Sequence, residues 1–223
     1  MSFVKICGIN SLEALDAALA AGADMVGLVR FGRSPRHLKL EEGRALSARA
    51  RGRVLRVALV VDADDAALAE TVEAFDPDLL QLHGSETPER VAAVRARFGR
   101  PVMKAVGIAD QADLAAIGAY QAVSDRLLLD AKPPAAAEAL PGGNGLAFDW
   151  RLIAGLDPGK PVMLSGGLDS RNVAAAIALT GVRAVDVSSG VERRPGEKDP
   201  EKIAAFIKAA RTAFADQDKD KVA

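Results

Sequence analysis

The segment FVKICGINSLE, residues 3–13, contains a strand, a tight turn and the start of a helix. Residues 4–8 are a short apolar run, which predicts a buried strand. Asn10-Ser11-Leu12-Glu13 predicts a capping box for a helix over residues 12–21, which ends at Gly22. The turn Cys7-Gly8-Ile9-Asn10 lacks the glycine fingerprint that follows the first strand of a dinucleotide-binding sheet. The segment therefore indicates an α/β protein and argues against that open sheet.

The same strand-and-helix pattern repeats along the whole chain. Short aliphatic runs predict strands, and the segments between them carry helical patterns. Near-continuous apolar strands are typical of a parallel sheet covered by helices. Eight such units in 223 residues predict a single (β/α)8 TIM barrel, with a doubly wound open sheet as the alternative. The predicted strands are residues 4–8, 25–30, 54–61, 79–83, 102–106, 126–130, 162–165 and 184–188, and the predicted helices are residues 12–21, 40–50, 65–75, 88–98, 111–122, 149–153, 171–179 and 200–214.

Composition narrows the class of protein and its location. We expect one catalytic domain over residues 1–215, followed by a polar, frayed tail at 216–223. A net charge of −1 gives no electrostatic reason to expect nucleic acid or a membrane surface as a partner. A single cysteine cannot form an internal disulfide, which favours the cytoplasm. The cysteine and the two histidines lie far apart in sequence, so no metal site is expected.

The barrel fold selects a short set of candidate site residues, because the active sites of such barrels lie at the C-terminal ends of the strands. Alternate side chains of a strand face the interior, so an inward Cys7 implies an inward Lys5. By the same rule Gln81 shares a face with His83. We also expect Arg56 and Lys104 inside the barrel, where they would belong to a network of charges. The predicted strand ends carry Cys7, Arg30, Asp62, His83, Gly107, Asp130 and two Gly/Ser turns.

Two of these side chains are candidates for proton transfer. Asp130 follows three leucines at the barrel mouth, where a carboxyl group can act as a general acid. Its alternative role is to cap a turn or to pair with Lys132. Cys7 is either a base or nucleophile, or an inert buried residue. An unperturbed thiol is mostly protonated at neutral pH, so a basic neighbour such as Lys5 would be needed to favour the thiolate.

The loops after the seventh and eighth strands predict a phosphate site. Ser165-Gly166-Gly167 and Ser188-Ser189-Gly190 combine glycine, which allows close backbone approach, with serine hydroxyl donors. Arg36, in the loop after the second strand, could clamp a carboxylate in a bidentate way, or could be a solvated loop residue. His37 has no feature that separates it from a surface histidine.

Six short motifs, each at or near a predicted strand end, occur in an order that resembles the phosphoribosylanthranilate isomerase family, barrel enzymes of tryptophan biosynthesis. The resemblance runs from Val4 to about Ala209. The motifs are Lys5-Ile6-Cys7-Gly8-Ile9; Gln81-Leu82-His83-Gly84; Leu128-Leu129-Asp130; Gly142-Gly143-Asn144-Gly145 with Phe148-Asp149-Trp150; Leu164-Ser165-Gly166-Gly167-Leu168; and Val185-Asp186-Val187-Ser188-Ser189-Gly190-Val191-Glu192.

The resemblance implies an Amadori rearrangement of N-(5-phosphoribosyl)anthranilate to 1-(2-carboxyphenylamino)-1-deoxyribulose 5-phosphate. It implies that Asp130 is the general acid and Cys7 the general base, without a cofactor or metal. Arg36 would hold the anthranilate carboxylate. The remaining substrate-binding candidates are Gln81, His83, Ser165, Gly166, Gly167, Ser188, Ser189 and Gly190.

Other functions stay open at this point. One alternative is a related sugar-phosphate isomerase of the histidine pathway. Such a protein would resemble barrels with an aspartate at the end of strand one and another at the end of strand five. This chain has Cys7 and Val106–Gly107 at those positions, which argues against it. A non-catalytic, phosphate-binding barrel is the alternative from another class. The loop at residues 131–145 is either a lid or a surface loop. The partner is expected to be a phosphorylated small molecule, and the chain a monomer or a homodimer.

Overall fold

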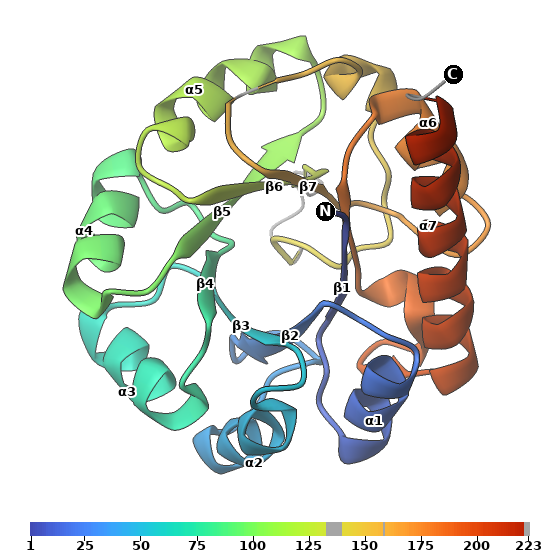
Figure 1. Cartoon of the computed structure of the whole chain (residues 1–223). Helices are drawn as coiled ribbons and strands as arrows, with labels where there is room; N and C mark the ends of the chain where they lie inside the picture. Colours follow the sequence, from blue (N-terminus) through green and yellow to red (C-terminus); the bar gives the residue numbers. More distant parts are fainter. Residues whose placement is uncertain (133–139, 158, 221–223) are drawn as a thin grey trace.

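The computed structural model describes residues 1–132, 140–157 and 159–220, and within them the chain forms a closed barrel. Eight parallel strands follow one another around the ring in sequence order, and the helices surround it (Figure 1). This arrangement confirms the predicted (β/α)8 fold. None of the helices described is long and apolar enough to cross a membrane.

The strands and most of the helices agree closely with the expected ranges, but the helix expected over residues 149–153 and the start of the one expected over residues 111–122 are 3-10 turns. The strands of the barrel are β1 Phe3–Cys7, β2 Met25–Arg30, β3 Leu55–Val60, β4 Leu79–Leu82, β5 Val102–Ile108, β6 Arg126–Ala131, β7 Val162–Leu164 and β8 Ala184–Val187. A two-stranded ribbon of β9 Glu192–Arg194 and β10 Glu197–Lys198 follows β8. The α-helices are α1 Leu12–Ala20, α2 Leu40–Ala50, α3 Asp65–Phe75, α4 Pro88–Phe98, α5 Ala115–Gln121, α6 Val173–Thr180 and α7 Pro200–Asp220, and the 3-10 turns are η1 Gln111–Leu114, η2 Trp150–Ile153 and η3 Ser189–Val191.

Local signals explain most of the helix boundaries. The side chain of Ser11 caps α1 by accepting a hydrogen bond from the N–H of Ala14, so the cap is formed by Ser11 and not by a Ser–Glu box. Thr87 caps α4 in the same way, and Gly99 ends that helix in the left-handed conformation, with a φ of 61°. These short-range contacts are why the bounds of α4 could be predicted to the residue.

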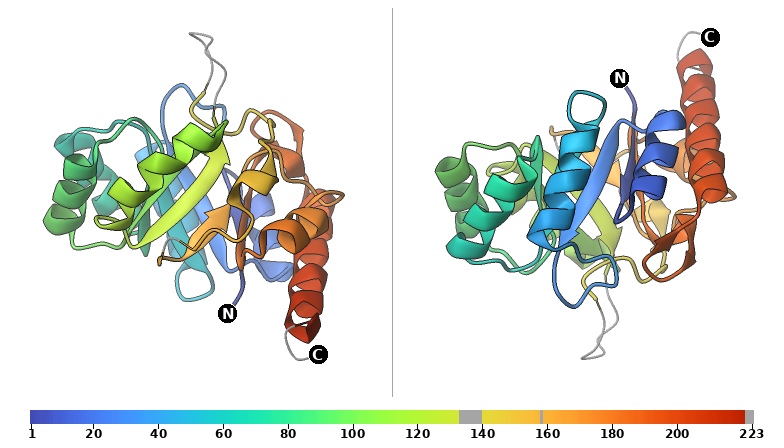
Figure 2. Two further views of the ribbon diagram at one scale, coloured as in Figure 1. Left: turned by 90° about the horizontal axis from the view of Figure 1, so that it is seen from above. Right: turned by 90° about the horizontal axis from the view of Figure 1, so that it is seen from below.

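The C-terminal helix differs from the expectation. We expected a helix that stops at residue 214 and a frayed tail, but α7 continues to Asp220 and runs past the barrel on the side of the N-terminus (Figure 2). Asp218 forms an ion pair with Arg183, and Asp216 pairs with Lys219 one turn later. These exposed polar contacts stabilise a segment that has few apolar residues of its own.

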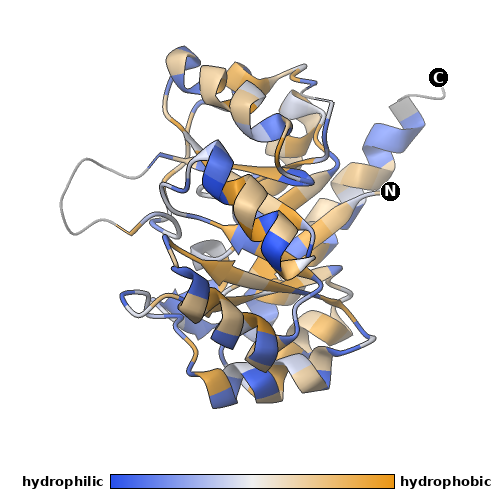
Figure 3. Ribbon diagram, turned by 90° about the vertical axis from the view of Figure 1, so that its left-hand side faces the viewer, coloured by the Kyte–Doolittle hydropathy of each residue, from blue (hydrophilic) through white to orange (hydrophobic). Residues whose placement is uncertain are grey.

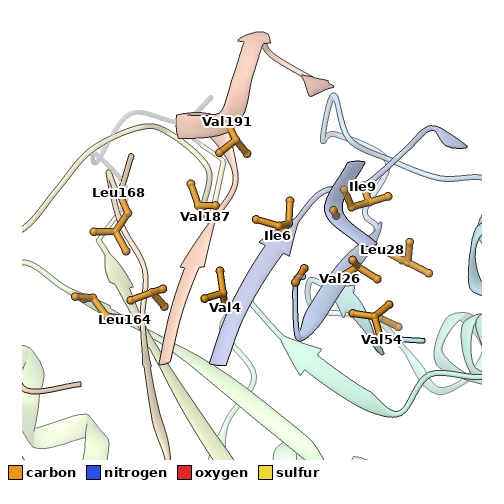
Figure 4. Packing of buried hydrophobic residues seen from close by; sticks show 14 of the residues in the cluster. Val4, Ile6, Ile9, Val26, Leu28, Val54, Leu164, Leu168, Val187 and Val191 are labelled. Carbon is orange, nitrogen blue, oxygen red and sulfur yellow. The ribbon is translucent and has the colours of Figure 1, made fainter. Parts of the chain in front are cut away.

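The apolar core has two layers, one outside the barrel strands and one inside them. Most apolar side chains lie between the strands and the helices, where Figure 4 shows Val4 and Ile6 of β1 beside Val187 of β8. Figure 3 shows the matching hydropathy, with apolar strands inside and polar stretches on the outer helices. A smaller layer fills the barrel interior with Met25, Val57, Leu79, Met103, Ala105, Leu128, Met163 and Ala184.

The strand parity is correct for β1 and β8 and wrong for β3 and β5. Lys5 faces inward beside Asp186, its register partner on β8, and their ion pair of 2.9 Å spans the seam that closes the barrel. Arg56 instead faces the helices and pairs with Asp78, while Val57 and its alternate neighbours face inward. Lys104 also points outward and binds Glu86 at 2.8 Å.

Candidate active site

Cys7 lies at the C-terminal end of β1, at the base of a hollow in the barrel mouth. Its side chain packs with Val29 and Leu59 and is 4% exposed. Apolar groups make up most of the hollow, which suits an aromatic ring, and Arg36 and His83 bring polar groups to it. The lining residues are Cys7, Val29, Phe31, Ser34, Arg36, Leu59, Val61, His83, Leu140, Pro141, Gly142 and Ser188.

The surroundings of Cys7 act on its thiol in opposite directions. Burial raises the pKa of the Cys7 thiol, and the Asp186 carboxylate adds to this effect, while the ammonium groups of Lys5 and Lys198 oppose it. Burial alone would lower the pKa of Lys5, but Asp186 and Cys7 outweigh it and raise that pKa. Lys5 therefore stays a cation beneath the thiol, and the resting site holds the thiol form.

Asp130 lies at the end of β6, in contact with the histidine that follows β4. Its Oδ2 is 3.2 Å from Nε2 of His83, and its Oδ1 accepts a hydrogen bond of 2.8 Å from the N–H of Ala131. Nδ1 of His83 lies 2.7 Å from the amide nitrogen of Gln81. Gln81 is fully buried below His83 and lines neither of the hollows of the site, so its contact is with the histidine.

Arg36 is held in place by a carboxylate that the sequence analysis did not select. Its Nε and Nη2 donate to the two oxygens of Glu192 at 2.7 and 2.8 Å, and Nη2 also reaches the carbonyl of Gly143 at 3.4 Å. The ammonium of Lys198 binds the same carboxylate at 2.8 Å. Arg36 is thus a buried, ordered side chain at the edge of the hollow, and the alternative of a solvated loop arginine is wrong.

Burial and neighbouring charges shift the pKa values of two groups in this Arg36–Glu192–Lys198 cluster. Burial would raise the pKa of Glu192, but Arg36 and Lys198 outweigh it and hold that pKa below its usual range. Burial lowers the pKa of Lys198 to about 8 despite the Glu192 carboxylate. At neutral pH the cluster holds two cations and one anion, so a positive charge remains for an anionic ligand.

A second hollow adjoins the first between the loops after β7 and β8. Gly166 and Gly167 have φ values of 86° and 64°, a backbone that glycine adopts without strain. Among the residues described, their N–H groups donate to no backbone acceptor. Free N–H groups with serine hydroxyls suit an anion. The lining residues are Asp130, Ala131, Gly143, Asn144, Gly145, Leu146, Ser165, Gly166, Gly167, Leu168, Asp186, Val187, Ser188 and Ser189.

The structure thus brings most of the predicted residues together at one mouth: Cys7, Arg36, His83, Asp130, Ser165, Gly166, Gly167, Ser188 and Ser189. Gly190 lies behind them, with its backbone against the carbonyl of Leu168. His37 contacts Arg30 and lines neither hollow. The proposed lid falls partly on residues 133–139, which lie outside the described residues. Within the residues described, no three His, Cys, Asp or Glu side chains form a group that could hold a metal ion.

Glu192 and Lys198 are the residues that sequence reasoning missed. Both are charged residues in the polar stretch after β8, and nothing local distinguishes them from their exposed neighbours Arg193 and Arg194. Their role follows from contact with Arg36, which is 156 residues from Glu192 in the chain. A position inside a motif that also holds Ser188 and Ser189 was the one available signal for Glu192.

Comparison with known proteins agrees with this geometry. Residues 4–209 match the family model described as N-(5'-phosphoribosyl)anthranilate (PRA) isomerase. A protein of that name from Azorhizobium caulinodans is 61% identical over 212 residues, covering 95% of this chain and 92% of the relative. Another from Rhodopseudomonas palustris is 56% identical and covers 94% of this chain and 96% of the relative.

Solved structures lead to the same family. The crystal structure of phosphoribosyl anthranilate isomerase from Thermotoga maritima superposes with a TM-score of 0.85 at 36% identity, covering 95% of this chain and 100% of that one. A complex of the enzyme with reduced 1-(o-carboxyphenylamino)-1-deoxyribulose 5-phosphate gives 0.82 at 35% identity, with the same coverage. The chain belongs to the N-(5'-phosphoribosyl)anthranilate isomerase family.

Proposed function

We propose that this protein catalyses the Amadori rearrangement of N-(5-phosphoribosyl)anthranilate to 1-(2-carboxyphenylamino)-1-deoxyribulose 5-phosphate in tryptophan biosynthesis. One observation carries the proposal. A carboxyl group, a thiol, an arginine and a Gly/Ser anion cradle all open onto one barrel mouth. The names of the relatives at 54–61% identity support the same activity.

Each part of the substrate has a matching part of the site. The phosphate would bind between the loops after β7 and β8, at the N–H groups of Gly166 and Gly167. The anthranilate ring would fill the apolar hollow, with its carboxylate at Arg36. The ribose would then lie between Asp130 on β6 and Cys7 on β1, which are three steps apart around the ring. Such positioning lowers the entropic part of the barrier.

Asp130 would start the reaction as general acid. Its proton goes to the furanose ring oxygen, the bond from that oxygen to C1 breaks, and the nitrogen lone pair forms the C1=N iminium bond. The carboxylate that remains would accept a hydrogen bond from the N–H of Ala131, and the His83 ring, whose Nε2 lies 3.2 Å from Oδ2, would add electrostatic stabilisation of the new negative charge.

Cys7 would complete the reaction as general base. The thiolate removes the proton on C2, and the C–H electron pair forms the C1=C2 bond of an enolamine while the iminium nitrogen becomes neutral. Tautomerisation then gives the ketose. A raised pKa makes the thiolate rare but strongly basic, and Lys5 and Lys198 favour its formation.

We also propose that the protein works in the cytoplasm, as a monomer or homodimer, without nucleic acid or membrane partners. The single buried cysteine and the net charge of −1 support this view. The relative from Thermotoga maritima is described as dimeric.

The fluorescence of anthranilate compounds provides the test. Purified protein is added to N-(5-phosphoribosyl)anthranilate generated in the cuvette, and we expect the substrate fluorescence to fall at a rate proportional to enzyme concentration. Asp130→Asn should lower kcat by about 10²–10⁴-fold with KM largely kept. Asp16→Asn, on the surface opposite Arg49, is the matched control. No fluorescence change at high wild-type concentration would contradict the proposal and favour a non-catalytic barrel.

A further inference from the structure

Gln81, His83 and Asp130 form a continuous array of contacts that leads from the barrel interior to the mouth. The Gln81 amide nitrogen is 2.7 Å from Nδ1 of His83, and Nε2 of the same ring is 3.2 Å from Oδ2 of Asp130. Gln81 is 0% exposed, and among the described residues its Oε1 has no hydrogen-bond partner. The amide thus has one strong contact, and that contact is with His83.

The strand between them leaves room for this array. Gln81 and His83 belong to the β4 segment, Asp130 is on β6, and β5 separates the two strands. The inward positions of β5 at this level are Ala105 and Gly107, the latter in register with Asp130. Because these residues have little or no side chain, His83 can reach across β5 to the acid.

The orientation of the amide decides which ring nitrogen carries the proton. An amide NH₂ can only donate, so Nδ1 opposite it must accept and the neutral ring must carry its proton on Nε2. The structure places the amide nitrogen of Gln81, and not Oε1, against Nδ1, and this orientation selects the Nε2–H tautomer. Nε2, which then carries the proton, lies 3.2 Å from Oδ2 of Asp130.

The tautomer controls the direction in which Asp130 can give its proton. If Nε2 were bare, the hydroxyl of the protonated acid would donate to His83 and not to the substrate. With the proton on Nε2, the ring offers no acceptor toward Oδ2, and the acidic proton is directed elsewhere. The same N–H stabilises the carboxylate once the proton has left.

We propose that Gln81 is a positioning residue that holds His83 in the Nε2–H tautomer and thereby directs the proton of Asp130 toward the sugar. The proposal rests on the function proposed above and adds a residue that acts through His83 without touching the substrate. Oδ1 faces the phosphate side of the site, since a Cβ at Gly166 would lie 3.2 Å from it.

Nitrogen NMR tests the array without reference to catalysis. The chain has only two histidines, so protein labelled with ¹⁵N-histidine gives two sets of ring signals, and those that vanish in His83→Gln belong to His83. We expect wild-type His83 to show a bare, hydrogen-bonded Nδ1 and a protonated Nε2. Gln81→Met, which removes the donor at similar volume, should shift the Nδ1 signal and introduce the Nδ1–H tautomer.

Kinetics tests the consequence of the array. Gln81→Met should lower kcat by about 10–100-fold while KM changes less than about threefold. Gln81→Asn, whose amide is one carbon too short to reach Nδ1, is the second variant if the first does not fold. Leu79→Met, an inward-facing residue of the same strand, is the matched control and should leave both kcat and the His83 signals unchanged.

Three outcomes would overturn the proposal. One is a wild-type His83 protonated on Nδ1. Another is a Gln81 variant with unchanged His83 signals, and the third is a changed tautomer with normal kcat. If wild-type protein shows no isomerase activity, the proposed function fails, while the ¹⁵N spectra still report whether Gln81 sets the ring.

Discussion

Cys7 shows how one residue can have opposite electrostatic neighbours. Burial keeps its proton on sulfur, whereas two lysines, one below it on β1 and one from β10, favour the thiolate. The sequence analysis foresaw Lys5 as a basic neighbour, because residues 5 and 7 share a strand face. Lys198 could not be foreseen, since its approach depends on the path of the ribbon after β8.

Cys7→Ser tests the role of the thiol. A serine hydroxyl is a far weaker base at neutral pH, so we expect kcat to fall by about 10²–10⁴-fold with KM within a few-fold of wild type. Steady-state assays of anthranilate fluorescence measure both constants. Retained activity after complete alkylation of Cys7, verified by mass spectrometry, would remove the thiol from the reaction.

Arg36 illustrates a side chain whose geometry matters more than its charge. Two of its nitrogens are fixed by Glu192, and a lysine cannot keep this bidentate contact while also reaching a carboxylate in the hollow. We expect Arg36→Lys to raise KM by about 10–100-fold and to change kcat less. Arg193→Lys, on the exposed side of the same ribbon, is the control. Unchanged KM in Arg36→Lys would show that this arginine does not bind the substrate.

At the scale of elements, two glycines in the described part of the loop after β6 lie directly against the site. A Cβ at Gly142 would lie 2.6 Å from Nε2 of His83 and 2.9 Å from Oδ2 of Asp130, and one at Gly143 would lie 2.5 Å from Nη1 of Arg36. Real Cβ atoms do not adopt these distances, so a side chain at Gly142 would move the loop, His83 or Asp130, and one at Gly143 would move the loop or Arg36.

Gly142→Ala should therefore impair the enzyme without unfolding it. We expect kcat to fall about tenfold or more, because the methyl group displaces His83 or Asp130 from their contact, while the melting temperature stays near that of wild type. Gly32→Ala, in the loop after β2 with open space around it, is the matched control. Equal kcat values for the two variants would show that the loop does not need to approach this closely.

Residue patterns predicted where the strands lie in the chain better than which of their side chains face the barrel interior. The β3 and β5 runs are apolar on both faces, so alternation carries no information on which face is inside. Arg56 and Lys104 were assigned inward without such information, and both bind carboxylates outside the barrel. In β1, by contrast, the position of Cys7 at the mouth fixed the phase.

At the scale of the whole molecule, buried Lys198 links stability to pH. Its pKa is lowered to about 8 by burial, whereas a lysine in the unfolded chain titrates near 10.4. Between these values the unfolded state binds more protons than the folded state, so the free energy of unfolding rises with pH in this window. Below about pH 8 both states are protonated and the slope disappears.

The thiol acts with the opposite sign. The raised pKa of Cys7 lets the folded state keep a proton that the unfolded state loses, so its contribution to stability falls as pH rises. We therefore compare Cys7→Ser with Cys7→Ser/Lys198→Met by urea unfolding between about pH 7 and pH 10. Between these pH values the free energy of unfolding of the single variant should rise by on the order of 2–3 kcal/mol relative to that of the double variant. If the free energies of unfolding of the two variants change with pH in parallel, the pKa of Lys198 is not lowered.

The order of strands and helices, the closed barrel and the strand-end positions of Cys7 and Asp130 were all accessible from residue order. Apolar periodicity, helix caps and glycine stops act over a few residues, so they can be recognised in the sequence alone. The contacts of Glu192 and Lys198 with Arg36, and of His83 with Asp130, join residues on different strands and loops. Those pairings depend on how far around the ring each strand lies and which way its side chains face, and these are properties of the closed barrel.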